Sequence, residues 1–409
     1  MQENKKHIVI ISPWHSPQQS VATNRIESFA KYLNSEKFNI TVLSLLKNKE
    51  PKYEKLSNYE LFRYKNDSIL KLPEFKSSDT KLVHKLKVVK KLVLLRLVKD
   101  VDFRWKKNIE KKLDKLNQVE KIDLIISSFA PKSCHEIVLN FMNKNKEVKW
   151  IADMRDEMSK NPFLYDNKLK LAYEKLEKKI NNQADAVTVV SAPIVNYFRE
   201  IMPDIQYIEE IRNGFDNELK IEKYSFNSAM TITYTGNFYG KKYKPDTFFE
   251  ALMECKDVLP NEWIIKFVGT PNNFNIPREF EKNIEIIPRV PQNVAIEYMK
   301  NSDINLLIQP HVGRKGMYTG KLFDYISVKK PILAVIDDKD VGADLIREIG
   351  IGYIADFYEK EEIISAIKEA VSDWKNKKKL NFDEDKIQYL HRKYQVKKME
   401  VLIEKILHE

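Results

Sequence analysis

The chain alternates short apolar runs with longer amphipathic segments. In its first half the runs are continuous and rich in β-branched residues, as expected for strands of a parallel sheet that is covered on both faces. These runs lie at 7–12, 39–45, 123–128, 149–153 and 186–191. Segments with helical spacing separate them, at 22–34, 133–145 and 165–183. The pattern therefore predicts βαβ units.

The second half repeats this rhythm. Its predicted strands lie at 230–236, 263–269, 284–290, 304–310, 331–336 and 352–356, with the clearest helices at 360–377 and 386–407. A polar, turn-rich stretch separates the halves. Because 409 residues exceed what one core usually holds, we expect two α/β domains, 1–213 and 214–385. The last helical segment, 386–409, is expected to pack back on the first domain.

Glycines are distributed unevenly between the predicted domains. The first of the ten glycines is Gly214, so the first domain cannot carry the glycine-rich turn that binds dinucleotides. Glycine lets the backbone approach a ligand closely. We therefore expect the second domain to hold a phosphate-bearing ligand.

Charge and cysteine content narrow the class of protein. The formal net charge is +11, which favours an anionic partner, although a generally lysine-rich composition would give the same excess. Cys134 and Cys255 are the only cysteines, which favours a reducing cytoplasm and argues against a zinc site. We find no signal peptide and no apolar run long enough to cross a membrane, so the protein is expected to be soluble or peripheral.

One stretch of the second domain combines glycines with charge. The loop after the predicted strand 304–310 contains Gly313, Gly316 and Gly320, and Lys321 and Asp324 follow at the start of a predicted helix. A lysine in a first turn opposes the helix dipole unless an anion such as a diphosphate also binds there. Asp324 would accept hydrogen bonds from the hydroxyls of a ribose. The alternative is an ordinary helix start with a solvated lysine.

Polar residues also follow the predicted strands of the first domain, and several could contact a substrate. They are His15, Asn24 and Arg25 after the first strand, His135 after the third, and Asp153, Arg155 and Asp156 after the fourth. Arg25 could bind a phosphate group, or be an ordinary solvated residue. A helix capped by Ser133 would keep His135 neutral and able to hydrogen-bond a sugar hydroxyl, unless His135 is structural. Asp153 or Asp156 could orient an acceptor or form an internal ion-pair network.

The segment 81–112 is the most basic part of the chain. It has twelve Lys and Arg residues against three acidic ones, with apolar residues at helical spacing. Such a helix could lie on an anionic membrane or be a solvated amphipathic helix. The DVD motif at 100–102 resembles a glycosyltransferase metal motif, but its position in a basic helical run argues for chance.

The stretch TGKLFDYISVKKPILAV resembles the second-domain signature of retaining glycosyltransferases with the GT-B fold, family 4. Asp324 matches the second acidic residue of that signature, which in the family binds the nucleotide ribose. Gly316 stands where the first glutamate of the signature is expected, which leaves open which group contacts the donor sugar. Family members with a TGKLFEY form share this departure.

The resemblance continues along most of the chain outside 47–120. Residues 231–252 are similar to the segment that grips the donor diphosphate, with Asn237 near the usual arginine, so Lys241, Lys242 or Lys244 would supply the charge. IRNGFD at 211–216 matches the hinge. SSFAPKSCHEIVLNF and WIADMRDEM resemble a bacterial surface-polysaccharide branch of the family.

The resemblance implies an α/β protein with two Rossmann-like domains whose parallel sheets face a central cleft. It implies a metal-independent, retaining glycosyltransferase without cofactor, cytoplasmic or peripheral at the inner face of the plasma membrane, that builds lipopolysaccharide O-antigen or capsule on a polyprenyl-diphosphate-linked glycan. His135 and Lys321 would be catalytic. The donor would contact Asn237, Lys241, Lys242, Lys244, Gly316, Tyr318, Thr319, Gly320, Lys321, Leu322 and Asp324, and the acceptor His15, Asn24, Arg25, Asp153, Arg155 and Asp156.

Three alternatives stay open at this point. A related nucleotide-sugar epimerase would need a set of acidic residues that we cannot identify. A glycosyltransferase-like subunit without activity would be compatible with Gly316. A basic nucleic-acid-binding protein would explain the charge alone, although we expect no nucleic-acid partner.

Overall fold

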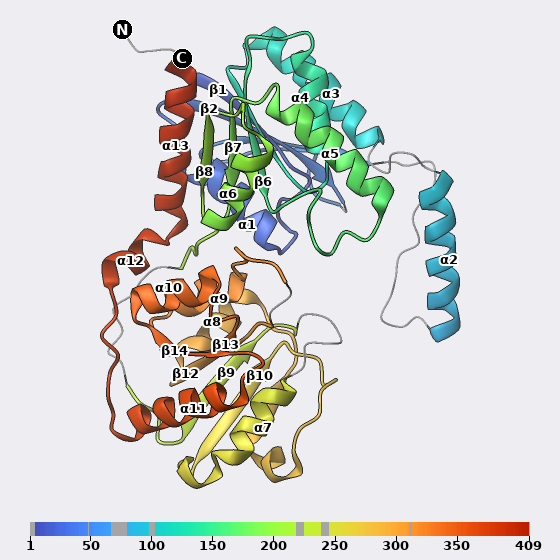
Figure 1. Ribbon diagram of the computed structural model, residues 1–409. Coiled ribbons are helices and arrows are strands. Elements are labelled where there is room, and N and C mark those ends of the chain that lie inside the picture. Colours follow the sequence, from blue (N-terminus) through green and yellow to red (C-terminus); the bar gives the residue numbers. More distant parts are fainter. Residues whose placement is uncertain are drawn as a thin grey trace. The chain divides into compact units, whose positions relative to one another are not determined.

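The chain forms two compact units, each with its own sheet (Figure 1). The computed structural model describes residues 5–47, 49–66, 80–97, 103–217, 225–238, 245–310 and 313–408. The first unit consists of 1–189, 195–210 and 396–409, and the second of 190–194 and 211–395.

The first unit is built on an eight-stranded sheet in the order β3-β4-β2-β1-β5-β6-β7-β8. All neighbouring strands are parallel except β3 and β4. The strands are β1 Lys6–Ile11, β2 Phe38–Leu46, β3 Tyr53–Lys55, β4 Glu60–Lys65, β5 Leu124–Ser128, β6 Lys149–Arg155, β7 Ala186–Val189 and β8 Tyr207–Glu210. The chain winds outward in opposite directions from β1 and from β5. The carboxyl ends of β1 and β5 therefore form the switch point at which such sheets usually bind ligands.

The helices of this unit, apart from α2, cover the sheet and are placed by their apolar faces and caps. The helices are α1 Val21–Tyr32, α2 Lys81–Leu97, α3 Phe103–Val119, α4 Ser133–Met142, α5 Asn167–Asn181, α6 Ala192–Ile201 and the main part of α13 Arg392–His408. Ser20 caps α1 by accepting from the Thr23 backbone N–H. Within this unit, Glu400 of α13 lies 3.5 Å from Lys37 and accepts from the backbone N–H of Asn34.

The hairpin β3–β4 was not predicted from the sequence. Leu61 and Arg63 of β4 point inward and are both buried. An arginine therefore occupies an inward position where an apolar residue would be expected. Arg63 is neutralised by Glu54 of β3 and donates to the Pro51 carbonyl. Because Arg63 interrupts the alternation of apolar and polar residues, the sequence pattern does not predict this strand.

The basic segment 81–112 belongs to two helices with different environments. Trp105, Ile109 and Leu113 of α3 are at most 1% exposed, and the Trp105 indole donates to the Ser44 carbonyl. The apolar residues of α3 thus pack into the core of the unit and are not available to a membrane surface. In α2, by contrast, Leu82 is 69% and Leu86 62% exposed. The DVD motif lies outside the described residues.

The second unit has a six-stranded parallel sheet in the order β11-β10-β9-β12-β13-β14. Its strands are β9 Met230–Thr235, β10 Trp263–Val268, β11 Ile284–Ile287, β12 Ile304–Ile308, β13 Ile332–Ile336 and β14 Gly352–Asp356. Here the switch point lies between β9 and β12. Alternate strand residues enter two cores, with Leu333 and Val335 on one face and Ile332 and Ala334 on the other.

Helices cover both faces of the second sheet. The helices are α7 Asp246–Glu254, η1 Lys256–Val258, η2 Arg278–Asn283, α8 Gln292–Lys300, α9 Gly320–Ser327, α10 Val341–Ile349, α11 Lys360–Lys375 and α12 Glu384–Tyr389. Residues of α7 and α11 line one core, and residues of α8, α9 and α10 the other. The helix predicted at 386–407 is divided between α12 and α13. Among the described helices, none combines the length and apolarity needed to cross a membrane.

Candidate functional site

Lys321 stands in the first turn of α9, at the carboxyl-end side of the second sheet. Its Nζ donates to the Tyr234 hydroxyl at 2.5 Å and to the Asn237 carbonyl at 3.0 Å, and it lies 4.0 Å from the centre of the Tyr234 ring. No carboxylate of the described residues pairs with it. Burial lowers the pKa of Lys321 to about 7. The solvated lysine of the alternative interpretation is therefore excluded.

A second first-turn lysine shows what an ordinary arrangement looks like. Lys360 begins α11, is substantially exposed, and lies 2.5 Å from the Glu254 carboxylate. Its hydrogen bond to Glu254 raises its pKa. Both lysines oppose a helix dipole, but only Lys360 has an anion of the protein to neutralise it. Lys321 is thus arranged for an anion that the described part of the protein does not supply.

Asp324 is on the same helix, three residues after Lys321. Its carboxylate makes no hydrogen bond to the described residues, and burial raises its pKa to about 6, although the charge of Arg392 opposes the rise. A largely buried carboxylate with unused acceptor positions is suited to a ligand that brings hydroxyl donors. The cation and the carboxylate together form a candidate site for a ligand with both an anionic and a polyol group.

Two glycines shape the backbone around this site. Gly236, with φ +78°, follows β9, and a Cβ there would lie 3.2 Å from Cε of Lys321. Gly316, with φ +88°, is buried; its N–H donates to Asp340 at 2.6 Å and its carbonyl accepts from Ser191 at 2.7 Å. A Cβ at 316 would lie only 2.6 Å from the Ser191 hydroxyl. Both polar groups of the Gly316 backbone are therefore used within the unit, and the predicted contact of Gly316 with the donor stays a prediction.

The other predicted donor residues divide into three groups. The Thr319 hydroxyl caps α9 through the Leu322 N–H, and the Leu322 side chain is 1% exposed in the core, so the side chains of both residues are engaged within the unit. Gly320 begins α9, Tyr318 packs on Phe323, and the exposed Asn237 holds Lys321 through its carbonyl. Lys241, Lys242 and Lys244 lie outside the described residues.

His135 is in the first turn of α4 and is completely buried. Its Nδ1 lies 2.7 Å from the Ser127 hydroxyl, which accepts from the Trp150 indole at 2.8 Å. Since the indole can only donate, Ser127 keeps its own proton, and donation of this proton to Nδ1 corresponds to the tautomer with the ring proton on Nε2. Burial lowers the pKa of His135 to about 4, so the ring is neutral. Burial, and not a Ser133-capped helix dipole, is the main cause, since Ser133 is not the N-cap of α4.

Arg25 and Asp153 are paired with each other. The Arg25 guanidinium donates to Asp153 at 2.6 to 3.1 Å, and Ser128 and Thr188 donate to the same carboxylate at 2.7 and 2.9 Å. Both side chains are at most 1% exposed. Asp153 thus takes part in the internal ion-pair network that was its alternative role, and the pair ties α1 to the carboxyl ends of β5, β6 and β7.

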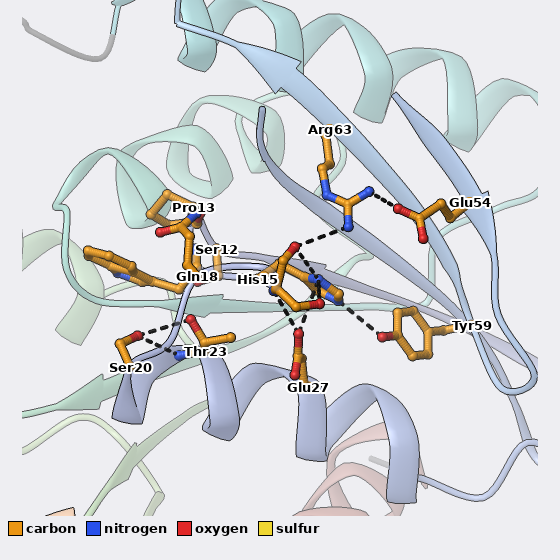
Figure 2. A network of polar contacts seen from close by, with 12 residues as sticks. Ser12, Pro13, His15, Gln18, Ser20, Thr23, Glu27, Glu54, Tyr59 and Arg63 are labelled. Carbon is orange, nitrogen blue, oxygen red and sulfur yellow. Dashed lines mark hydrogen bonds and ion pairs between the residues drawn. The ribbon is translucent and has the colours of Figure 1, made fainter. Parts of the chain in front are cut away.

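His15 is held in a polar network between two loops (Figure 2). Its Nε2 lies 3.0 Å from the Tyr59 hydroxyl and its Nδ1 3.2 Å from the Glu27 carboxylate, while Arg63 donates to the Ser16 carbonyl at 3.2 Å. The side chain is 3% exposed. In this structure His15 therefore fixes the loop after β1 to the β3–β4 hairpin, and its predicted contact with an acceptor stays a prediction.

The remaining predicted acceptor residues keep accessible polar groups. Asn24 on α1 and Asp156 after β6 are both partly exposed. Arg155 ends β6 and has no hydrogen-bond partner for its Nε among the described residues. Sequence reasoning missed Tyr234, Ser127 and Trp150, whose roles depend on contacts between distant strands.

One acidic cluster lies apart from these residues. Carboxylate oxygens of Asp337, Asp338 and Asp356 lie within 4.8 Å of one another after β13 and β14. Lys315 pairs with Asp337 at 2.6 Å, which already supplies a cation there.

Comparison with known proteins is informative at the level of structure. No protein-family model matches the sequence, and no curated protein is significantly similar to it. Sucrose-phosphate synthase from Thermosynechococcus elongatus superposes with a TM-score of 0.64 at 11% identity, over 99% of this chain and 100% of the other. Trehalose-6-phosphate synthase OtsA gives 0.63 at 12% identity, over 98% and 99%.

A third similar structure was solved with a nucleotide sugar. HepE from Anabaena, in complex with UDP-glucose, gives a TM-score of 0.55 at 10% identity, over 98% of this chain and 99% of the other. Identities this low establish the fold and nothing finer. They confirm the prediction of fold class: the chain has the GT-B fold.

Proposed function

We propose that the protein is a glycosyltransferase that moves a hexosyl group from a nucleoside-diphosphate sugar to a glycan acceptor. The observation that carries the proposal is the pair Lys321 and Asp324, two largely buried groups at one helix start that form no ion pair with the described residues. A diphosphate would pair with the Lys321 ammonium group, and the hydroxyls of a ribose would donate hydrogen bonds to the Asp324 carboxylate. Similarity along the whole chain to HepE, whose structure contains UDP-glucose, supports this ligand class.

The chemistry assigned to these residues is electrostatic. As the bond between the sugar carbon and the diphosphate oxygen breaks, negative charge grows on the diphosphate, and charged Lys321 stabilises it. The acceptor oxygen bonds to the sugar carbon, and its proton passes to the departing diphosphate. We propose that the reaction retains configuration and needs no metal, as the resemblance to family 4 implies.

The donor proposal is tested by thermal unfolding with nucleoside diphosphates in EDTA. We expect UDP or GDP to raise the melting temperature, since ligand at about one hundred times its Kd contributes about 2.7 kcal/mol. An unchanged melting temperature with every nucleoside diphosphate would refute the donor site. An inactive subunit would show the shift but no transfer, and an epimerase would convert the nucleotide sugar without an acceptor.

We further propose that the acceptor is lipid-linked, in surface-polysaccharide synthesis at the cytoplasmic face of the membrane. The support is α2, which has no acidic residue and exposes Leu82 and Leu86 together with Lys85 and Lys90. Apolar and cationic side chains on one helix suit an anionic bilayer surface.

This proposal predicts that the protein pellets with vesicles containing anionic lipid. Replacing Leu82 and Leu86 by glutamine should abolish pelleting, because it removes the apolar contact with the bilayer. Replacing the surface residues Lys170 and Lys175 of α5 should leave pelleting intact. Equal pelleting of the wild type and the leucine variant would contradict a role for α2.

A further inference from the structure

Arg155 has an unusual backbone conformation. Among the described non-glycine residues, Arg155, Lys329 and Lys377 have positive φ angles, of 58°, 55° and 49°. Lys329 and Lys377 directly follow the C-caps of α9 and α11, where a left-handed residue commonly ends a helix. Arg155 instead ends strand β6, at a shift in register against β7. Strain of this kind at a strand end, without a helix to terminate, is typical of functional sites.

The Arg155 guanidinium is also unpaired. Its Nε is buried without a hydrogen-bond partner, and no ion pair to the described residues involves it. Asp153, two residues away, is occupied by Arg25, Ser128 and Thr188. Asp156 acts on Arg155 only through its charge. The cation thus lacks the acceptor that a largely buried guanidinium normally requires.

His135 presents a second donor without an acceptor in the same neighbourhood. Its Nε2 is buried and unpartnered, while its Nδ1 is fixed by Ser127. The charge of Arg155 acts on the His135 ring and helps to lower its pKa, after burial and against the charges of Asp153 and Glu136. Glu136 itself is paired with Lys132 and Lys106. Both donors follow β5 and β6, on the carboxyl-end side of the sheet near its switch point.

We propose that Arg155 and His135 bind an oxyanion, a phosphate or carboxylate group carried by the acceptor. A guanidinium is a donor only, and so is Nε2 in the tautomer in which Ser127 donates to Nδ1, so a ligand that binds both must bring acceptors. A sugar hydroxyl would also bring a proton that needs an acceptor, and Asp153 has none to spare. An oxyanion brings acceptors alone and neutralises Arg155. The inference rests on the proposed function, because it assigns the first unit to the acceptor.

The test uses the full chain labelled with ¹⁵N in its seven histidines. The Nε2 resonance of His135, identified by its loss in His135→Gln, is followed while inorganic phosphate or glucuronate is added. We expect a saturable shift with at least one of them. Saturation by phosphate indicates a phosphate-bearing acceptor, and saturation by glucuronate indicates an acidic sugar. A resonance that neither anion moves overturns the proposal.

Two glycine variants separate binding from backbone strain. Arg155→Gly should lose the shift, yet melt at a higher temperature than the wild type, because it removes both the strained φ and the unpaired cation. Lys377→Gly relieves the same φ at an exposed helix end and should keep the His135 shift. Full binding by Arg155→Gly would refute the role of the guanidinium. UDP binding through Lys321 should persist in Arg155→Gly. If the wild type itself fails to bind UDP, that result counts against the proposed function and not against the role of Arg155.

Discussion

Replacing Lys321 by methionine should weaken UDP binding by about 10- to 100-fold, the equivalent of about 1.5–3 kcal/mol for one charge-assisted hydrogen bond. Transfer activity should fall further, by about 100- to 1,000-fold in kcat, because the lysine also stabilises charge that grows on the departing diphosphate. Titration calorimetry measures the first effect and initial rates the second. The fold should persist, because methionine removes a desolvated cation and retains most of the side-chain volume.

Lys360→Met is the matched control for this variant. Lys360 also stands in a first helical turn of the second unit, but it is exposed and paired with Glu254. Its replacement should change UDP affinity and kcat by less than about twofold, since surface ion pairs contribute little. Equal effects of the two replacements would show that Lys321 contributes only general charge.

Replacing Asp324 by asparagine should have opposite effects on stability and binding. The pKa of Asp324 is raised to about 6, so the folded state favours the protonated form, and ionisation at higher pH destabilises it. The amide of the variant does not ionise, and above pH 6 the free energy of unfolding should therefore rise by about 1–3 kcal/mol. Affinity for UDP should fall, whereas affinity for pyrophosphate, which has no ribose, should change little.

The pH dependence identifies the cause of the stability change. The cost of ionising Asp324 is absent below about pH 4, grows between about pH 4 and 6, and is constant above that. The gain in melting temperature should therefore be present at pH 8 and vanish near pH 4. Asp344→Asn, at an exposed acid in the first turn of α10, serves as control and should show no such gain. A gain independent of pH would point to helix propensity instead.

Much of the fold could be predicted because its central strands are continuous apolar runs. Two of the strands that were missed, β3 and β8, are the two edges of the first sheet. They have only three and four residues, and neither is buried on both faces. These two strands form because they pair with a neighbouring strand, and the hydrophobic pattern of a single segment does not reveal such pairing.

The candidate site was predictable where its chemistry is local. Lys321 and Asp324 share one helix turn, so the sequence alone placed them together. Arg25 and Asp153 are 128 positions apart, and neither local sequence shows that the two side chains form an ion pair with each other. The same holds for Gly316, whose backbone is engaged by Ser191 and Asp340. Arg25, Asp153 and Gly316, which were predicted to contact a ligand, instead contact distant segments of the protein in this structure.

The most direct test of the nucleotide site is the number of protons taken up when UDP binds at pH 8. It is measured in EDTA by calorimetry in two buffers of different ionisation enthalpy. Lys321, with a pKa of about 7, is mostly neutral at this pH, and a bound diphosphate favours its charged form. We predict an uptake of up to about 0.9 protons per UDP in the wild type and none in Lys321→Met. Binding without proton uptake in the wild type would contradict the assignment of Lys321 to the diphosphate.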